Sequence, residues 1–455
     1  MQPLAQGAIE SQKVEESRDG ALGASKRARQ ASVRAFRACL ILLCAFAIYF
    51  ALRQGIGAWY FHQNTPPAVE RAAQWDPENA QYADVLANLA HFYSANPDPS
   101  QIVALCEKAV RLSPHDAHYW ADLGSAYDWA GRPDDAQRAF ERSLSLFPNS
   151  PEINWRLANF YARTNRADDA LPLLRRALVA GGVDDRQVFA LVSRSGLNNQ
   201  TVMTRMLPPD GALLVDYLDF QVDSGRLDRA GEVWDRLLRS GLPFRIADAF
   251  PYFDALVRAK NADAASRVWD GLGRRFPAEL APRTADGNLI TDGDFELPIL
   301  NGGFDWRVNP VRGAAVRIEP GRAGGGGLLR IDFDGRGNLE YGDVLQLVPV
   351  RPSTHYVFSA EVRAQGITTD SGPRFELVDA DAVQVTEDLI GTSGWSLRRI
   401  GLRTGPLTRL LWVRIARPAS HKLDDKISGT FLVRRVSLKP QDERRTAKQP
   451  SPDPR

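Results

Sequence analysis

The sequence is poor in the residues that build redox, metal and nucleophilic sites. Its 455 residues include 3 cysteines and 6 histidines. Cys39 and Cys44 share one apolar run and Cys106 stands alone beyond it, so the chain offers no disulfide framework. His115 and His118 have the spacing of metal ligands, but they lie in an expected turn without a third ligand. We therefore predict no metal site and no cofactor.

Motifs typical of enzymes are scarce as well. The glycine run at 324–327 lacks the Lys-Ser/Thr pair of a phosphate-binding loop, so it indicates a flexible hairpin loop. The acidic pairs Asp134-Asp135 and Asp168-Asp169 fall where helices are expected to start. No Ser-His-Asp or Cys-His arrangement presents itself. With 57 basic and 55 acidic residues, the chain gives no reason to expect nucleic acid as a partner. We predict that the protein is not an enzyme and has no catalytic residues.

What the chain does contain is one apolar run near its start. Residues 38–52 carry no charge, and the run reaches the ~20 residues of a membrane span if Arg53 extends its guanidinium to the interface. Five basic residues and no acidic ones occupy the twelve positions before it. By the positive-inside rule, residues 1–37 form a disordered basic cytoplasmic tail and residues 38–60 a transmembrane signal anchor. We place the protein in a bacterial inner membrane, which it crosses once, with the C-terminal domains periplasmic or extracellular.

Three alternatives to a retained anchor remain at this stage. A signal peptide would be cleaved near Gly55-Ile56-Gly57, although the preceding tail is long for one. A lipoprotein would need a small residue before its acylated cysteine, whereas Leu43 precedes Cys44. A buried core helix is disfavoured by the basic flank.

A repeated segment follows the apolar run. Residues 86–114 align without a gap with residues 120–148, at an offset of 34 residues. A fixed period of this size indicates stacked helix pairs. In the second copy Gly131-Arg132-Pro133 separates the two helices and Pro148 ends the unit.

Large and small residues in the second copy fall at helix-pair positions, namely Trp120, Leu123, Gly124, Tyr127, Ala136, Phe140 and Pro148. They match seven of the eight signature positions of the tetratricopeptide repeat, which this segment resembles. Cys106 stands in a slot that the family fills with a packed hydrophobic residue. Weaker copies at 224–238 and 260–277, a lone second helix at 68–77 and degenerate helices at 181–210 predict about five helix pairs over residues 66–277. The resemblance implies an all-α solenoid whose first helices line a concave groove.

The resemblance implies that this groove binds a peptide or a partner protein. Carried over by register, its residues are Asp84, His91, His118, Ser125, Asp128, Trp129, Glu152, Trp155, Asn159 and Arg163. Trp129 and Trp155 occupy no signature packing slot. They either contact the partner or pack between adjacent repeats, since large aromatic side chains are enriched in both places.

The periodicity changes from helical to alternating after Pro277. Eight or nine alternating runs, separated by Gly- and Pro-rich turns, predict a sandwich of the jelly-roll type over residues 285–440, followed by a disordered tail at 441–455. The main runs are 314–318, 328–333, 344–350, 356–363, 375–378, 395–402, 410–415 and 430–438. The predicted fold class is a multi-domain chain with one transmembrane helix, an all-α solenoid and an all-β sandwich.

Four motifs follow one another in this region. They are "NLITDGDFE" at 288–296, Gly303-Phe304-Asp305-Trp306, "VPVRPSTHYVFSAEVRA" at 348–364 and the final strand at 429–438. Their order resembles the carbohydrate-binding-module-like jelly rolls, which share a galactose-binding-like sandwich. The resemblance implies sugar binding through exposed aromatic rings, and the glycan candidates are Tyr341, Trp306 and Trp412. Trp306 also stands where the family packs its core, and that interpretation is the stronger one for it.

The last strand departs from the family pattern. The family commonly has acidic residues there, which help to hold a structural calcium, whereas Arg434 and Arg435 precede Val436-Ser437-Leu438 here. Two cations disfavour a calcium ion, which needs six to eight oxygen ligands. We predict instead that Asp294 or Glu296 pairs with one of these arginines.

These domains predict a non-enzymatic, membrane-anchored scaffold of a bacterial cell envelope. Its groove would bind a protein partner and its sandwich a glycan or a second protein, an arrangement that suits exopolysaccharide assembly or export by analogy of fold. The main alternative is a purely structural subunit of an envelope protein complex with no sugar binding. A third possibility, an enzyme with the sandwich as an accessory, would need a catalytic domain that the sequence does not show.

Overall fold

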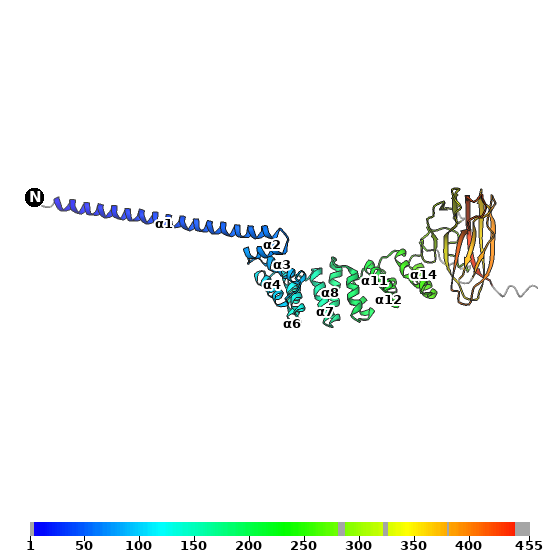
Figure 1. The fold of residues 1–455 in the computed structure, drawn as a ribbon, viewed down its shortest axis with the longest axis horizontal. Helices are drawn as coiled ribbons and strands as arrows, with labels where there is room; N and C mark the ends of the chain where they lie inside the picture. Colours follow the sequence, from blue (N-terminus) through cyan, green and yellow to red (C-terminus); the bar gives the residue numbers. More distant parts are fainter. Residues whose placement is uncertain (1–3, 281–286, 322–325, 380–381, 442–455) are drawn as a thin grey trace, which may run out of the picture. The chain divides into compact units, whose positions relative to one another are not determined.

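The computed structural model describes residues 4–280, 287–321, 326–379 and 382–441, with side chains at Arg29 and from Ser32 onward. It has a long N-terminal apolar helix, a solenoid-like helical region and a C-terminal two-sheet domain (Figure 1), which confirms the predicted fold class. The described residues form two compact units. The first holds the chain up to Asp184 together with Leu191–Leu197, and the second holds Asp185–Ala190 and the chain from Asn198.

Helix α1 runs from Leu4 to Phe61 without a break. Its part from Ser32 to Phe61 is long and apolar enough to cross a membrane, and its most apolar stretch is not buried inside the protein. The predicted disorder of residues 1–37 is wrong from Leu4 onward, because that stretch is helical. The segment is rich in strong helix formers such as Ala, Glu, Lys, Arg and Gln, and contains no proline after Pro3.

The end of α1 packs against the next helix, α2 (Pro66–Trp75). The Arg53 Nε donates a hydrogen bond to the Trp75 carbonyl oxygen at 2.6 Å. A Cβ at Gly57 would lie 3.3 Å from the Asp76 Cβ, a tight contact that the glycine avoids. Helix α2 was predicted to be a lone second helix, and this is wrong, because the last turns of α1 serve as its partner.

Three helix pairs complete the first unit. They are α3 (Ala80–Phe92) with α4 (Pro99–Leu112), α5 (Ala117–Trp129) with α6 (Pro133–Leu146), and α7 (Pro151–Arg163) with α8 (Ala167–Ala180). Short polar side chains cap α3, α4, α5 and α7, each accepting a backbone N–H of the first turn. Gly124 faces the Phe140 ring, and a Cβ there would lie 2.8 Å from it. The small signature residue therefore lets the two helices of a pair approach closely.

The first two helices after α8 are shorter than those of the preceding pairs. Helix α9 (Asp185–Arg194) lies across the division between the units, and α10 (Asn199–Arg205) follows, so the predicted degenerate helices have 10 and 7 residues. The remaining elements are α11 (Gly211–Asp223), α12 (Leu227–Ser240), the 3-10 helix η1 (Ile246–Ala249), α13 (Phe250–Arg258) and α14 (Ala262–Arg275). Six pairs thus follow α2 among the described residues, one more than predicted.

The β domain consists of two antiparallel five-stranded sheets. One has the order β1-β4-β9-β6-β7, with β1 (Trp306–Val308), β4 (Tyr341–Pro349), β9 (Leu410–Arg417), β6 (Arg374–Val378) and β7 (Val383–Val385). The other has the order β2-β3-β10-β5-β8, with β2 (Ala314–Glu319), β3 (Leu328–Asp334), β10 (Ser428–Pro440), β5 (His355–Gln365) and β8 (Ser396–Arg403). All eight listed runs form strands, and the runs missed are β1 and β7.

The segment before β1 contacts the last helix pair of the same unit. Phe304 is 1% exposed, and its ring centroid lies 4.8 Å from that of Phe253 and 6.0 Å from that of Trp269. The Arg307 Nη2 lies 2.9 Å from the Asp254 Oδ1. The β domain therefore packs on α13 and α14 through an aromatic cluster and an ion pair.

Candidate protein-binding groove

A row of polar side chains lies on the first helices of three successive pairs. Asn88 on α3, Asp122 on α5 and Arg156 on α7 are spaced by 34 residues, the repeat period. The Arg156 Nη1 donates to the Asp122 Oδ1 at 2.5 Å, and its Nη2 donates to the Glu152 Oε1 at 2.7 Å. Each repeat therefore presents a polar residue at the same place, and two of the three are joined across repeats.

The row includes two neighbouring carboxyl groups. Asp84 lies one turn before Asn88, whose Nδ2 donates to the Asp84 Oδ2 at 3.3 Å. Burial and the nearby Asp122 carboxylate raise the pKa of Asp84 to about 7. The negative charge of Asp122 favours the protonated form of the Asp84 carboxyl group. This end of the groove therefore holds a proton close to neutral pH.

A cavity of about 150 Å³ adjoins the row. Its walls include Asn88 and His91 from α3, Ser125 from α5 and Arg156 from α7. Cys106 of α4 also lines it, with 3% of the residue exposed. Burial, followed by the neighbouring acidic side chains, raises the pKa of the Cys106 thiol to about 12. Cys106 is thus the packed neutral side chain that the sequence predicts.

The remaining predicted groove residues mostly make contacts between repeats. The His91 ring meets the Trp129 ring edge-on, with 4.8 Å between centroids. The His118 Nδ1 lies 4.0 Å from the Glu152 Oε2, and the Arg163 guanidinium pairs with the Asp128 carboxylate. Trp129 packs against the preceding repeat, and 40% of the residue remains exposed.

Trp155 and Asn159 lie on α7 and are half-buried. The Asn159 Nδ2 donates to the Trp155 carbonyl oxygen at 2.9 Å within the same helix.

The prediction missed the middle of the groove. Asn88, Asp122 and Arg156 were not among the predicted residues, although a shift of 34 residues relates all three. Polar residues repeated at that period on otherwise apolar helices were the available signal. The signature pattern consists of residues that pack between helices, so it does not include the polar residues of this row.

Comparison with known proteins supports the resemblance of the helical region to tetratricopeptide repeats. Residues 130–194 match the tetratricopeptide repeat family. Anaphase-promoting complex subunit 3 of Schizosaccharomyces pombe is 28% identical over 134 residues, which cover 30% of this chain and 19% of that protein. The chain thus spans about a fifth of that relative's length.

Solved structures that are similar to part of this chain include the following two. One is YrrB, described as a TPR protein with an unusual peptide-binding site, with 16% identity, a TM-score of 0.25 and coverage of 47% of this chain and 95% of that one. The other is PilW, described as a type IV pilus biogenesis factor, with 20% identity, a TM-score of 0.23 and coverage of 44% and 95%. Similarity at this level carries no argument about what the chain binds.

The aromatic glycan candidates lie mainly in the core of the β domain. Trp306 is fully buried, and its Nε1 donates to the Asp292 carbonyl oxygen at 3.2 Å. Tyr341 is 3% exposed. Neither ring has a free face for a sugar, so the prediction of Trp306 and Tyr341 as sugar platforms is wrong. Trp412 is half-buried, with the Arg307 guanidinium 5.8 Å from its ring.

The predicted partners of the two arginines in β10 are also wrong. The Arg434 Nε and the Arg435 Nη1 lie 2.7 and 2.9 Å from the Glu361 carboxylate, so Asp294 and Glu296 are not their partners. The physical reason is strand order, because β10 lies beside β5 and Arg434 is directly opposite Glu361.

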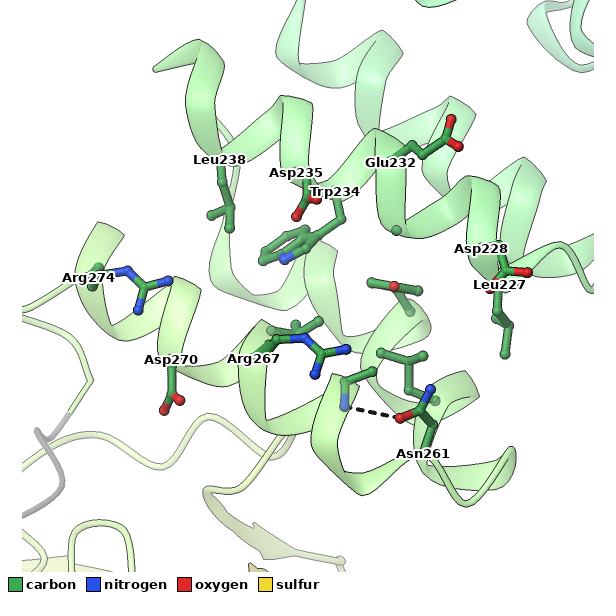
Figure 2. A pocket seen from close by; sticks show the side chains of 15 residues that line it. Leu227, Asp228, Glu232, Trp234, Asp235, Leu238, Asn261, Arg267, Asp270 and Arg274 are labelled. Atoms are coloured by element: carbon green, nitrogen blue, oxygen red, sulfur yellow. Dashed lines mark hydrogen bonds between the residues drawn. The ribbon is translucent and has the colours of Figure 1, made fainter. Parts of the chain in front are cut away.

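A larger pocket, of about 540 Å³, lies between α12 and α14 in the second unit (Figure 2). Trp234 projects into it from α12, where acidic side chains such as Asp235 line one wall. Arg267 and Arg274 line the opposite wall on α14. The tetratricopeptide pattern did not predict this pocket, because it lies between second helices and the pattern points to first helices.

Proposed function

We propose that this protein is a non-enzymatic, membrane-anchored scaffold whose tetratricopeptide groove binds a protein partner. The carrying observation is the polar row of Asn88, Asp122 and Arg156, which continues across three repeats beside a cavity of about 150 Å³. Trp129 adds an exposed aromatic surface next to this row. Rigid aromatic and arginine side chains in such positions commonly supply most of the binding free energy of a protein interface.

The anchor in this proposal is the first part of α1. Residues 53–61 belong to the folded domain, because Arg53 bonds to the end of α2 and the Phe61 ring lies 4.8 Å from that of Tyr82 in α3. The membrane part is then residues 32–52, which rise by about 30 Å as a helix, with Arg34 and Arg37 extending their guanidinium groups to the near interface. The predicted span of 38–60 thus moves toward the N-terminus. A cleaved signal sequence is the alternative outcome.

The location follows from the charges around this helix. Arg34 and Arg37 lie at its start, which favours a cytoplasmic N-terminus and a single pass through a bacterial inner membrane. The tetratricopeptide and β domains would then be periplasmic or extracellular. A reporter enzyme fused after residue 64 tests this topology, since activity on the cytoplasmic side would contradict it.

The β domain extends the scaffold with a second binding surface. We assign it a glycan or a second protein as ligand, in envelope polysaccharide assembly or export, and this step rests on analogy of fold. The competing function is a structural subunit of an envelope complex that binds no sugar.

The groove is tested with a matched pair of tryptophan variants in the full-length, detergent-purified protein. Trp129 is 40% exposed in the groove, and Trp75 is 44% exposed on α2 outside the polar row. A partner first captured by crosslinking in cells is purified and titrated against each variant. Trp129→Ala should weaken binding by about thirtyfold, as expected for a loss of about 2 kcal/mol at a binding hot spot, and Trp75→Ala should not. Equal affinity of the two variants for the partner would show that the groove is not the binding surface.

A further inference from the structure

Three neighbouring strands of the β domain present many cations on their outward side. In β5 the residues Tyr356, Phe358, Ala360 and Val362 are buried, so the residues between them face outward. Strands β10 and β8 flank β5 in the same sheet. Across these three strands, all of which the structure describes, the outward cations are Arg363, Arg399, Arg403, Arg434, Arg435 and Lys439, and the one outward carboxylate is Glu361.

A β-bulge adds one of these cations to the face. Successive residues of a strand normally point to opposite sides. The pairing of β10 with β5 shifts between Arg434 and Ser437, and Arg435 has a φ of 53°. As a result, both Arg434 and Arg435 reach the same carboxylate, Glu361, at 2.7 and 2.9 Å. The backbone accepts an unfavourable left-handed residue at this place, which is typical of bulges that redirect a side chain.

The first arginine of this pair is held on two sides. The Arg434 guanidinium carbon lies 4.1 Å from the centre of the half-buried Trp395 ring. The carboxylate of Glu361 holds its other side. Arg434 remains 35% exposed and Arg435 64% exposed. Two guanidinium groups thus share one carboxylate, which leaves a preorganised site with a net positive charge.

We propose that this face, which we call the arginine face and define by Arg363, Arg399, Arg434, Arg435 and Trp395, binds an acidic polysaccharide through its carboxylate groups. The proposal rests on the glycan part of the function proposed above and locates its site. Guanidinium groups bind carboxylates through two parallel hydrogen bonds. Neutral sugars stacked on the aromatic rings predicted from the sequence would not use this surface.

The layout of the arginine face suits a chain with repeated charges. Neighbouring strands are about 4.8 Å apart, so cations on β10 and β8 are spread over about 10 Å, and Arg399 and Arg403 are four positions apart along β8. Ser359 of β5 lies opposite Ser437 of β10 and places hydroxyl groups between the cations. Hydroxyl groups alternating with guanidinium groups match the hydroxyl and carboxylate groups of an acidic glycan.

The test uses the full-length protein in detergent and alginate, a polyuronate, as the probe. Dextran serves as the neutral polymer of comparable size. In biolayer interferometry, the Arg434→Gln/Arg435→Gln variant should bind alginate at least about tenfold more weakly than the wild type, because charge-assisted hydrogen bonds are lost. The control is Arg317→Gln/Arg336→Gln, which removes the same charge from exposed arginines on β2, the far edge strand of the same sheet, and in the loop after β3. It should retain the wild-type affinity.

A second variant guards against misfolding of the first. Arg399→Gln changes an exposed residue without touching the pair at Glu361, and it should also weaken alginate binding while the melting temperature stays unchanged. Equal weakening in the control variant would overturn the site, as would stronger binding to dextran. Equal and arginine-dependent binding to duplex DNA or to phosphatidylglycerol nanodiscs would overturn the assignment to a glycan.

The outcomes separate this site from the proposed function. If the wild type binds none of the polysaccharides, the glycan part of the proposed function fails and the groove is unaffected. If the wild type binds alginate and the Arg434/Arg435 and Arg399 variants bind it with the same affinity, the glycan function stands and the arginine face is not the binding site.

Discussion

Replacing Phe304 with alanine should uncouple the β domain from the last helix pair. Phe304 precedes β1 and packs against Phe253 and Trp269, with ring planes at 87° and 72°. The neighbouring Gly303 has a φ of 59°, and a Cβ there would lie 2.0 Å from the Trp269 ring. The segment is therefore shaped to fit α13 and α14. All of these residues lie in the second unit.

The size of the effect follows from the burial of this side chain. Truncating a fully buried phenylalanine to alanine costs about 3–5 kcal/mol. If about 3 kcal/mol of this cost falls on the contact with the helices, the opening equilibrium of α13 and α14 rises by about two powers of ten. Hydrogen–deuterium exchange of the full-length protein measures this directly. The amides of α14 should exchange about a hundredfold faster, and those of α5 and α6 in the other unit should not change.

The control is Phe431→Ala. Phe431 is also fully buried, but it lies in the core between the two sheets. This variant destabilises the β domain without removing a contact to the helices. If the exchange of α14 rises no more in Phe304→Ala than in Phe431→Ala, then Phe304 does not couple the two parts.

Two further changes test buried polar groups. The pKa of Asp84 is raised to about 7 in the folded protein, above the ordinary 3.8, so the unfolded chain loses this proton first and stability falls as the pH rises from about 4 to 7. Asp84→Asn should therefore raise the free energy of unfolding at pH 8 and not at pH 4 in urea titrations followed by circular dichroism, and the opposite dependence would contradict the raised pKa. The Tyr341 hydroxyl is buried and has no hydrogen-bonding partner among the described residues. Tyr341→Phe should raise the free energy of unfolding by about 1 kcal/mol, and a decrease of that size would show that the hydroxyl is satisfied.

The fold was largely predictable because its signals are repeated along the chain. The helix pairs bury corresponding positions, so the period of 34 residues survives even where single signature residues differ. The strands alternate between core and solvent, which identified eight of the ten that the structure describes. Strands β1 and β7 have three residues each, too few for a period of two to be seen. The pairing of α1 with α2 was missed because an apolar helix end gives the same signal in lipid and in a protein core.

The sites were less predictable because they depend on contacts between distant residues. Glu361 and Arg434 are 73 positions apart, and only the order of the strands brings them together. Alternation along β4 shows that neighbouring side chains point to opposite sides of the sheet. Which side is buried, and so whether Tyr341 is buried, depends on where the second sheet packs. The polar row was missed but could have been predicted, because its members are related by the repeat period and can be found without knowledge of the fold.

The contact of α1 with α2 and α3 also bears on where the scaffold would hold its partner. Arg53 bonds to α2, and Phe61 packs on Tyr82, which belongs to the same helix as Asp84 and Asn88. The polar row therefore begins on the first helix after α2, within the same compact unit as the proposed anchor. No flexible linker separates the two, because the connection between α1 and α2 comprises only residues 62–65. If residues 32–52 span the membrane, a partner in the groove is held close to the membrane surface, whereas a groove on a long linker would sample a wide range of heights.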